Sequence, residues 1–410
     1  MNKNLVYFVA SNLLTRGMGY FIQLTLIFFV SVEDVGYLRI SQSFIEVGVL
    51  IAGFGLTTGI LKVNSEQSLC EFDKKNNYLT SVVLTFFSSI FVCLVIIVVA
   101  INNVFSSIGV VNDLMIYSSF YCMLNSFVNL IICDYQIKDK YKELSFTQFK
   151  IKLLSLLVFV MLIYSYGIYG YVLGLYFSAG LAITIMFKNT FEYKLFSIDI
   201  AKSIMYIKNV KRIAFFAMMS NGVNLTTKYA SVFIAASMNL NEREFGYLSI
   251  ALTISLGLEI LTNSVQQFYL PKLSKTSSNM SYWKLKFNSI ENKYSLLSLF
   301  IFIITNFIFY LLVANLFNEY QNVFIYYSII STSWLISSFY TMKGPAFISI
   351  GRTDINFVVV LTSSPIVFIL SYFLVSEFEV LGVALAKIAH SSLMTASYIY
   401  AFRRVTNVAN

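Results

Sequence analysis

The sequence predicts an all-α, polytopic membrane protein with twelve transmembrane helices, and three observations support this fold class. Of the 410 residues, 58% are hydrophobic and only 12% are charged, and the mean hydropathy is +0.74. Soluble globular proteins are about 45–50% apolar and about 25% charged. The apolar runs reach the roughly 20 residues that a helix needs to cross a bilayer. They also lack the alternation of apolar and polar residues that is typical of a transmembrane barrel strand.

We assign twelve spans from these apolar runs. The first run is too long for the apolar region of a signal peptide and has no cleavage site of small residues, so we expect it to remain as a span. The longest connection is the lysine-rich segment 189–211, which we expect to be a loop. The spans are 4–30, 36–61, 78–101, 114–136, 146–165, 168–188, 212–236, 245–270, 293–314, 321–350, 355–376 and 379–402.

The distribution of charge predicts the orientation of the spans. Most of the 29 basic residues fall in one set of alternate loops, whereas the opposite loops hold mainly Asp and Glu. Because cytoplasmic loops carry an excess of Lys and Arg, we expect both termini to be cytoplasmic. Contact with the inner leaflet then explains the formal net charge of +9, and no motif indicates a nucleic-acid partner.

Cysteine and histidine are sparse, which excludes several kinds of site. Cys70, Cys93, Cys122 and Cys133 form no CxxC pair, so neither a disulfide framework nor a zinc site is indicated. His390 is the only histidine, so a multi-histidine metal or haem site is excluded. No nucleotide-binding loop is present, and we expect no metal and no other cofactor.

Short matches between the two halves of the chain indicate an internal repeat. The segment VEDVGYLRI (32–40) aligns with EREFGYLSI (242–250), and GIYGYVLG (167–174) aligns with EVLGVALA (379–386). The offsets are 210 and 212 residues, and the second alignment pairs Gly170 with Gly382. We therefore expect an N-lobe, 1–200, with helices 1–6, and a C-lobe, 201–410, with helices 7–12. Lobes with an even number of spans share one topology, so a pseudo-two-fold axis along the membrane normal should relate them.

Three sequence segments of the chain resemble those of a known family. The opening EDVGYLRIS of the second span, the segment FYLPKLSK (268–275) and the Gly-x-x-Gly start of the sixth span are similar to the polysaccharide-exporter branch of the multidrug/oligosaccharidyl-lipid/polysaccharide superfamily. Within that branch the chain resembles an O-antigen flippase (Wzx-like). The resemblance implies a MATE-like fold, a place in lipopolysaccharide biosynthesis and a multi-pass location in the bacterial inner membrane.

Charged residues inside the spans are candidates for a functional site, because such residues normally face a cavity or a partner. The cations are Arg16, Arg39, Lys228, Lys343 and Lys387, against Glu46 and Glu259. Polar residues at helical spacing accompany several of them. We interpret six residues as substrate-binding, namely Arg16, Lys228, Arg39, Lys387, Asn12 and Asn224. Glu46, Glu259 and His390 are candidates for ion coupling.

Structural roles for the same residues stay open. Arg39 lies one turn inside the outer end of its span and could snorkel to the interface. Lys343 precedes Gly344-Pro345 and could reach the inner interface. Glu46 could serve only as a partner for Arg39, and His390 could be a packing residue.

The leading hypothesis for function is a flippase for a polyprenyl-diphosphate-linked oligosaccharide. A cationic vestibule suits the diphosphate of that substrate, and alternating access would move it between the leaflets. The resemblance implies undecaprenyl diphosphate as the carrier, a coupling proton or sodium ion, and a polysaccharide polymerase and a chain-length regulator as partners.

Two other classes of function compete with this hypothesis. A cation/drug antiporter of the same superfamily should have an acidic N-lobe interior, whereas here the cations outnumber the acids. A membrane enzyme, such as a polymerase or an acyltransferase, should carry a large outer loop or a histidine-based cluster, and the chain has neither. We therefore expect no enzyme activity.

Overall fold

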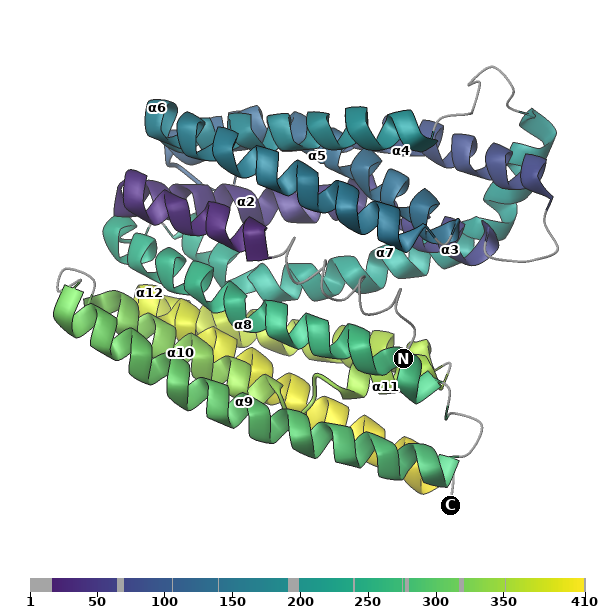
Figure 1. Cartoon of the computed structure of the whole chain (residues 1–410). Coiled ribbons are helices and arrows are strands. Elements are labelled where there is room, and N and C mark those ends of the chain that lie inside the picture. The colour runs from purple at the N-terminus through teal and green to yellow at the C-terminus, as the bar shows by residue number, and fades with distance from the viewer. Residues whose placement is uncertain are drawn as a thin grey trace. The chain divides into compact units, whose positions relative to one another are not determined.

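A computed structural model gives the fold, and helices form all of its regular structure in the residues that it describes (Figure 1). These residues are 17–64, 70–104, 106–138, 140–190, 199–238, 240–274, 276, 280–316, 321–350 and 352–408. The first helix is Gly17–Phe29. The later ones are α2 (Val32–Ala52), α3 (Leu56–Asn64), α4 (Glu71–Ile101), α5 (Gly109–Ile137), α6 (Tyr141–Thr190), α7 (Ile200–Ser237), α8 (Glu242–Ser274), α9 (Met280–Leu316), α10 (Gln321–Ser337), α11 (Lys343–Ser349) and α12 (Thr353–Val408).

The helices agree with the twelve predicted spans. Seven helical stretches of the described chain are long and apolar enough to cross a membrane. Two of them, in α6 and α12, each contain a kink at which the chain passes from one predicted span to the next. The second predicted span is divided between α2 and α3, and the tenth between α10 and α11. The chain is a polytopic all-α membrane protein, as the composition predicted.

The two kinks share one backbone conformation at equivalent positions of the repeat. Gly167 has φ 58° and ψ −133°, and Glu379, which lies 212 residues later, has φ 51° and ψ −128°. Gly170 and Gly382 then let the two arms of each hairpin approach closely. A Cβ atom on Gly170 would lie 2.0 Å from the Leu162 carbonyl oxygen. A Cβ atom on Gly382 would lie 1.9 Å from the Leu374 carbonyl oxygen. The matches between 167–174 and 379–386 therefore encode two hairpins of the same geometry.

The chain divides into two compact units. One comprises Met1–Val30 and Tyr37–Leu225, and the other comprises Ser31–Gly36 and Thr226–Asn410. We call them the N-terminal unit and the C-terminal unit. The predicted lobes, 1–200 and 201–410, and the axis that relates them stay predictions.

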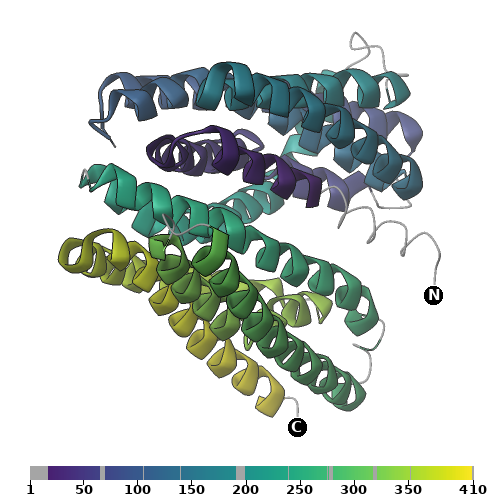
Figure 2. The same ribbon diagram turned by 60° about the vertical axis from the view of Figure 1, so that its left-hand side comes forward.

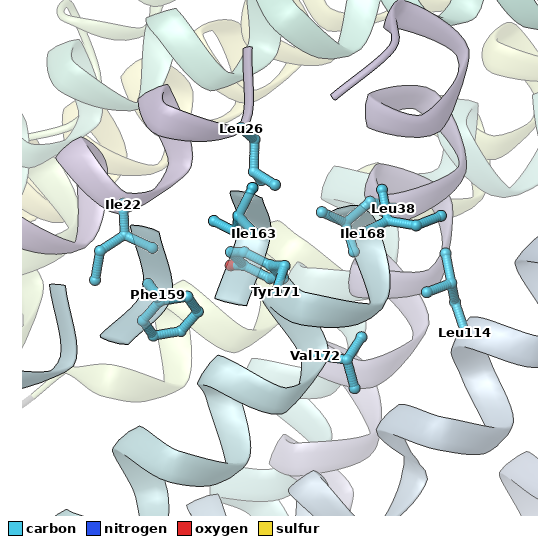
Figure 3. Close-up of a cluster of buried hydrophobic side chains, with 9 residues drawn as sticks. All are labelled: Ile22, Leu26, Leu38, Leu114, Phe159, Ile163, Ile168, Tyr171 and Val172. Atoms are coloured by element: carbon cyan, nitrogen blue, oxygen red, sulfur yellow. The ribbon is translucent and has the colours of Figure 1, made fainter. Parts of the chain in front are cut away.

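The N-terminal unit is built on α4, α5 and α6. In both views their blue and teal ribbons run side by side, and α5 packs against each of the other two (Figures 1 and 2). One core cluster of this unit gathers side chains from Gly17–Phe29, α2, α5 and α6 (Figure 3). The cluster consists of Ile22, Leu26, Leu38, Leu114, Phe159, Ile163, Ile168, Tyr171 and Val172. This packing holds both arms of the α6 hairpin against the first helix.

The C-terminal unit is centred on α10, which packs against α8, α9 and α12. In the same unit, the Ser31–Gly36 segment crosses the start of α8 at two glycines that the repeat pairs. A Cβ atom on Gly36 would lie 3.2 Å from the backbone nitrogen of Gly246. A Cβ atom on Gly246 would lie 2.1 Å from the Val32 carbonyl oxygen. Only glycine therefore permits this crossing.

The expected loop at 189–211 is wrong in its second half, because α7 begins at Ile200. The lysines that suggested a loop lie on an amphipathic helix whose other face is packed. Tyr206 and Val210 are buried against Leu56 of α3. Lys202 Nζ donates a hydrogen bond of 2.7 Å to Asp73 Oδ1 of α4, and this bond holds the pKa of the Asp73 carboxyl below its ordinary value.

Outward-facing helices present apolar stripes that are typical of contact with lipid. On α4 the side chains of Phe87, Phe91, Leu94 and Val98 are exposed at helical spacing. On α9 the exposed side chains are Leu296, Phe300, Ile303 and Phe307. A soluble protein rarely exposes a continuous apolar face of this length, so these stripes lie within the hydrocarbon of the bilayer.

Candidate functional site

Three of the predicted site residues meet in the C-terminal unit. Lys228 Nζ of α7 lies 2.8 Å from Glu259 Oε2 of α8. Lys387 Nζ of α12 donates a hydrogen bond of 2.5 Å to the backbone carbonyl oxygen of Lys228. Lys228 and Glu259 keep 35% and 41% of their side-chain surface exposed, so this group is open to water or a ligand. We call these three residues the C-unit charge cluster; its formal charge is +1.

Hydroxyl and aromatic groups surround the C-unit charge cluster. Ser333 Oγ of α10 donates a hydrogen bond of 2.9 Å to the Lys387 carbonyl oxygen, and lies 2.8 Å from Ser391 Oγ. The Tyr229 ring centroid lies 5.9 Å from Lys228 Nζ and 5.8 Å from Lys387 Nζ, within the range of cation–π attraction. Hydroxyls and an aromatic face are groups that bind sugars as readily as they support neighbouring helices.

His390 lies on α12, one turn after Lys387. Its Nε2 atom is buried and has no hydrogen-bond partner among the described residues. Its neighbours Lys387 and Ser391 contact the Lys228 carbonyl oxygen and Ser333 Oγ, respectively. Its role in ion coupling stays a prediction.

A second polar group lies in the N-terminal unit around Tyr171 of α6. The Tyr171 side chain lies near Gln23 of the first helix and Gln42 of α2, and the charges of Arg39 and Glu46 both act on it. Arg39 is only 6% exposed, so it lies in the protein interior and does not snorkel to the interface. Glu46 is exposed. Residues of the second predicted span therefore lie close to Tyr171.

Lys343 has a structural environment. It is buried, and its Nζ atom forms an ion pair with Glu291 of α9 and donates a hydrogen bond of 2.7 Å to the Phe339 carbonyl oxygen. The rings of Phe287 and Phe402 lie 5.9 and 5.6 Å from the same atom. A carboxylate and two rings therefore enclose Lys343, and the interpretation that it reaches the inner interface stays a prediction.

The three remaining site residues are Arg16, Asn12 and Asn224. Arg16 and Asn12 lie outside the residues that the structure describes. Asn224 is exposed on α7. Their assignment to the substrate stays a prediction.

The sequence reasoning missed one pocket, which lies in the N-terminal unit and has a volume of 410 Å³. We call it the N-unit pocket. Its lining includes two pairs of polar residues at i, i+4 spacing, Asn125 and Asn129 on α5 and Gln148 and Lys152 on α6. That spacing is visible in the sequence, but Lys152 lies near the cytoplasmic start of a predicted span, where lysines are common.

The comparisons with known proteins agree with the fold. A family model described as "Polysaccharide biosynthesis protein" matches residues 26–320, which is more than half of the chain. No curated protein matches the sequence.

Several solved structures are similar over nearly the whole chain. An inward-facing multidrug resistance MATE family transporter of the MOP superfamily is 10% identical, with a TM-score of 0.75 and 99% of both chains covered. The lipid II flippase MurJ, in an inward closed conformation, is 14% identical, with a TM-score of 0.77 and 97% of this chain and 87% of that chain covered. A MOP superfamily transporter from Pyrococcus furiosus is 11% identical, with a TM-score of 0.66 and 100% of this chain and 96% of that chain covered. All three are named as transporters or flippases, and at such identities the likeness shows the fold alone.

Proposed function

Because the chain belongs to the polysaccharide biosynthesis protein family, we propose that it is a flippase for a lipid-linked polysaccharide precursor. Its substrate is a polyprenyl-diphosphate-linked O-antigen repeat unit, which it moves from the cytoplasmic to the periplasmic leaflet by alternating access. The protein resides in the bacterial inner membrane with both termini in the cytoplasm.

The observation that carries this proposal is the excess of cations in the C-unit charge cluster. Two ammonium groups, those of Lys228 and Lys387, lie with a single carboxylate, that of Glu259. Charged groups inside a membrane protein are costly unless they are compensated, and the three residues of this cluster have a formal charge of +1, which favours an anionic ligand. The diphosphate of a polyprenyl-linked sugar is such a ligand, and charge-assisted hydrogen bonds from Lys or Arg would hold it.

The remaining predicted residues complete the proposed substrate path. Arg16 and Arg39 add positive charge on the N-terminal side of the chain, and Asn12 and Asn224 supply amide groups for sugar hydroxyls. Glu46, Glu259 and His390 are the candidates to carry a coupling proton or sodium ion. A polymerase and a chain-length regulator act on the product after it reaches the outer leaflet.

A cation/drug antiporter is the competing function, because multidrug transporters share the fold. A site for cationic drugs requires an excess of carboxylates, and the C-unit charge cluster has the opposite sign.

A deletion experiment tests the proposal in the organism that carries the gene. Loss of the gene should abolish surface O-antigen and leave lipid-linked repeat units in the inner membrane. The wild-type gene should restore the polysaccharide, and Lys387→Ala should restore much less at equal protein abundance. Normal surface polysaccharide after deletion would overturn the proposal.

A further inference from the structure

The N-unit pocket has the chemistry of a sugar site. It lies between the first helix, α5 and both arms of α6, at Gly19, Tyr121, Asn125, Lys152 and Ser178 among others. Its volume of 410 Å³ is within the range of small-molecule sites, about 300–1,000 Å³. Its lining combines amide, phenol and hydroxyl groups with apolar groups such as Ile151. Such a mixed lining suits a ring that carries hydroxyls on its edge and C–H groups on its faces.

Lys152 is the only charged residue among the described residues that line the pocket. It follows the start of α6 by eleven residues, or about 16 Å along the helix at 1.5 Å per residue. Its side chain is partly buried, whereas Lys150 on the same helix is exposed. The described lining residues include no carboxylate, so this ammonium favours an anion from the ligand.

The balance of charge selects the kind of anion. A single ammonium matches a single negative charge, and the neutral groups around it, Asn125, Gln148 and Ser178, match hydroxyls. A diphosphate carries more negative charge than one lysine compensates. A sugar carboxylate is therefore the better fit for this pocket.

We infer that the N-unit pocket binds an acidic sugar of the transported oligosaccharide, with Lys152 holding the sugar's carboxylate. This inference rests on the proposed function, because it names which part of the lipid-linked substrate enters the N-terminal unit. It also makes Lys152 a determinant of specificity between acidic and neutral glycans.

A binding experiment on the purified full chain tests the inference. The probes are a polyprenyl-diphosphate disaccharide that ends in glucuronic acid, its carboxyl-reduced neutral counterpart, and polyprenyl diphosphate without sugar. The wild-type protein should bind the acidic probe at least about tenfold more tightly than the neutral one, as expected for a charge-assisted hydrogen bond. Lys152→Gln should remove this preference, Lys152→Arg should keep most of it, and Lys150→Gln should leave it unchanged.

The outcomes separate the inference from the proposed function. An equal loss of binding for acidic and neutral probes in Lys152→Gln would overturn the inference, as would an unchanged preference, because Lys152 would then serve the fold or the interface alone. The inference would also be overturned if the sugar-free diphosphate probe bound as tightly as the acidic probe and lost the same affinity in Lys152→Gln. In each of these cases the wild-type protein would still bind lipid-linked sugars, so the flippase proposal would stand. Failure of the wild-type protein to bind all three probes would count against both.

Discussion

Replacing Glu379 with glycine should stabilise the protein. Glu379 forms the kink of α12 with φ 51° and ψ −128°, a conformation that side chains with a Cβ atom rarely adopt. The repeat-equivalent kink in α6 has Gly167 in nearly the same conformation. Glycine adopts this conformation without steric cost.

The magnitude follows from two opposing terms. A non-glycine residue in a sparsely populated region of φ/ψ space costs about 1–3 kcal/mol. Glycine regains that free energy but loses about 0.5–1 kcal/mol through the greater entropy of the unfolded chain. Glu379→Gly should therefore raise the free energy of unfolding by about 1 kcal/mol, and Gly167→Ala should lower it by a similar amount.

The variants Gly167→Ala and Gly180→Ala isolate the free-energy cost of the positive φ angle. The measurement is SDS-induced unfolding of the purified protein in mixed micelles. At both Gly167 and Gly180 of α6, an added Cβ atom would meet no atom within 4 Å. Only Gly167 has a positive φ, so Gly180→Ala should stabilise the helix by about 0.5–1 kcal/mol whereas Gly167→Ala destabilises it. If Glu379→Gly lowers stability, or if Gly167→Ala behaves like Gly180→Ala, the reasoning from the hairpin geometry is refuted.

Three further predictions concern packing, charge and topology. Gly246→Ala should reduce the yield of folded protein sharply, since its Cβ atom would lie 2.1 Å from the Val32 carbonyl oxygen, and normal yield and thermal stability would contradict the crossing. Lys228→Glu should abolish export of polysaccharide. The double variant Lys228→Glu with Glu259→Lys should recover protein abundance but not export, so full recovery of export would reduce Lys228 to a structural partner. Labelling of single cysteines in intact cells should place positions 75, 140, 208 and 284 inside and positions 113 and 242 outside, and one position on the wrong side would break the twelve-span topology.

Composition and periodicity were sufficient for the fold because the bilayer restricts the choice so strongly. Runs of about 20 apolar residues leave only the helix to satisfy the backbone, and each predicted span has a helical counterpart in the described chain. The short glycine matches between the halves were also informative. Gly170 and Gly382 mark close approaches within hairpins, and no residue with a side chain could take their place.

The details that the sequence did not predict depend on contacts between distant segments. We expected a loop at the start of α7 because this segment is rich in lysine. The buried face of this helix packs against Leu56, which lies more than 140 residues earlier in the chain. Glu291, the ion-pair partner of Lys343, lies 52 residues earlier in the chain, and the N-unit pocket requires the packing of α5 against α6. Helical spacing identified Lys228, Glu259 and Lys387 as candidates, but their mutual distances came only from the structure.

Transport of a lipid-linked oligosaccharide by the purified protein tests the central claim most directly. A fluorescent polyprenyl-diphosphate oligosaccharide in proteoliposomes should move between the leaflets when the wild-type protein is present and an ion gradient is applied. Lys228→Ala and Lys387→Ala should each slow this movement by about tenfold or more, as expected for loss of a charge-assisted hydrogen bond to the head group. Wild-type liposomes that move the probe no faster than protein-free liposomes, or variants that match the wild-type rate, would contradict the account.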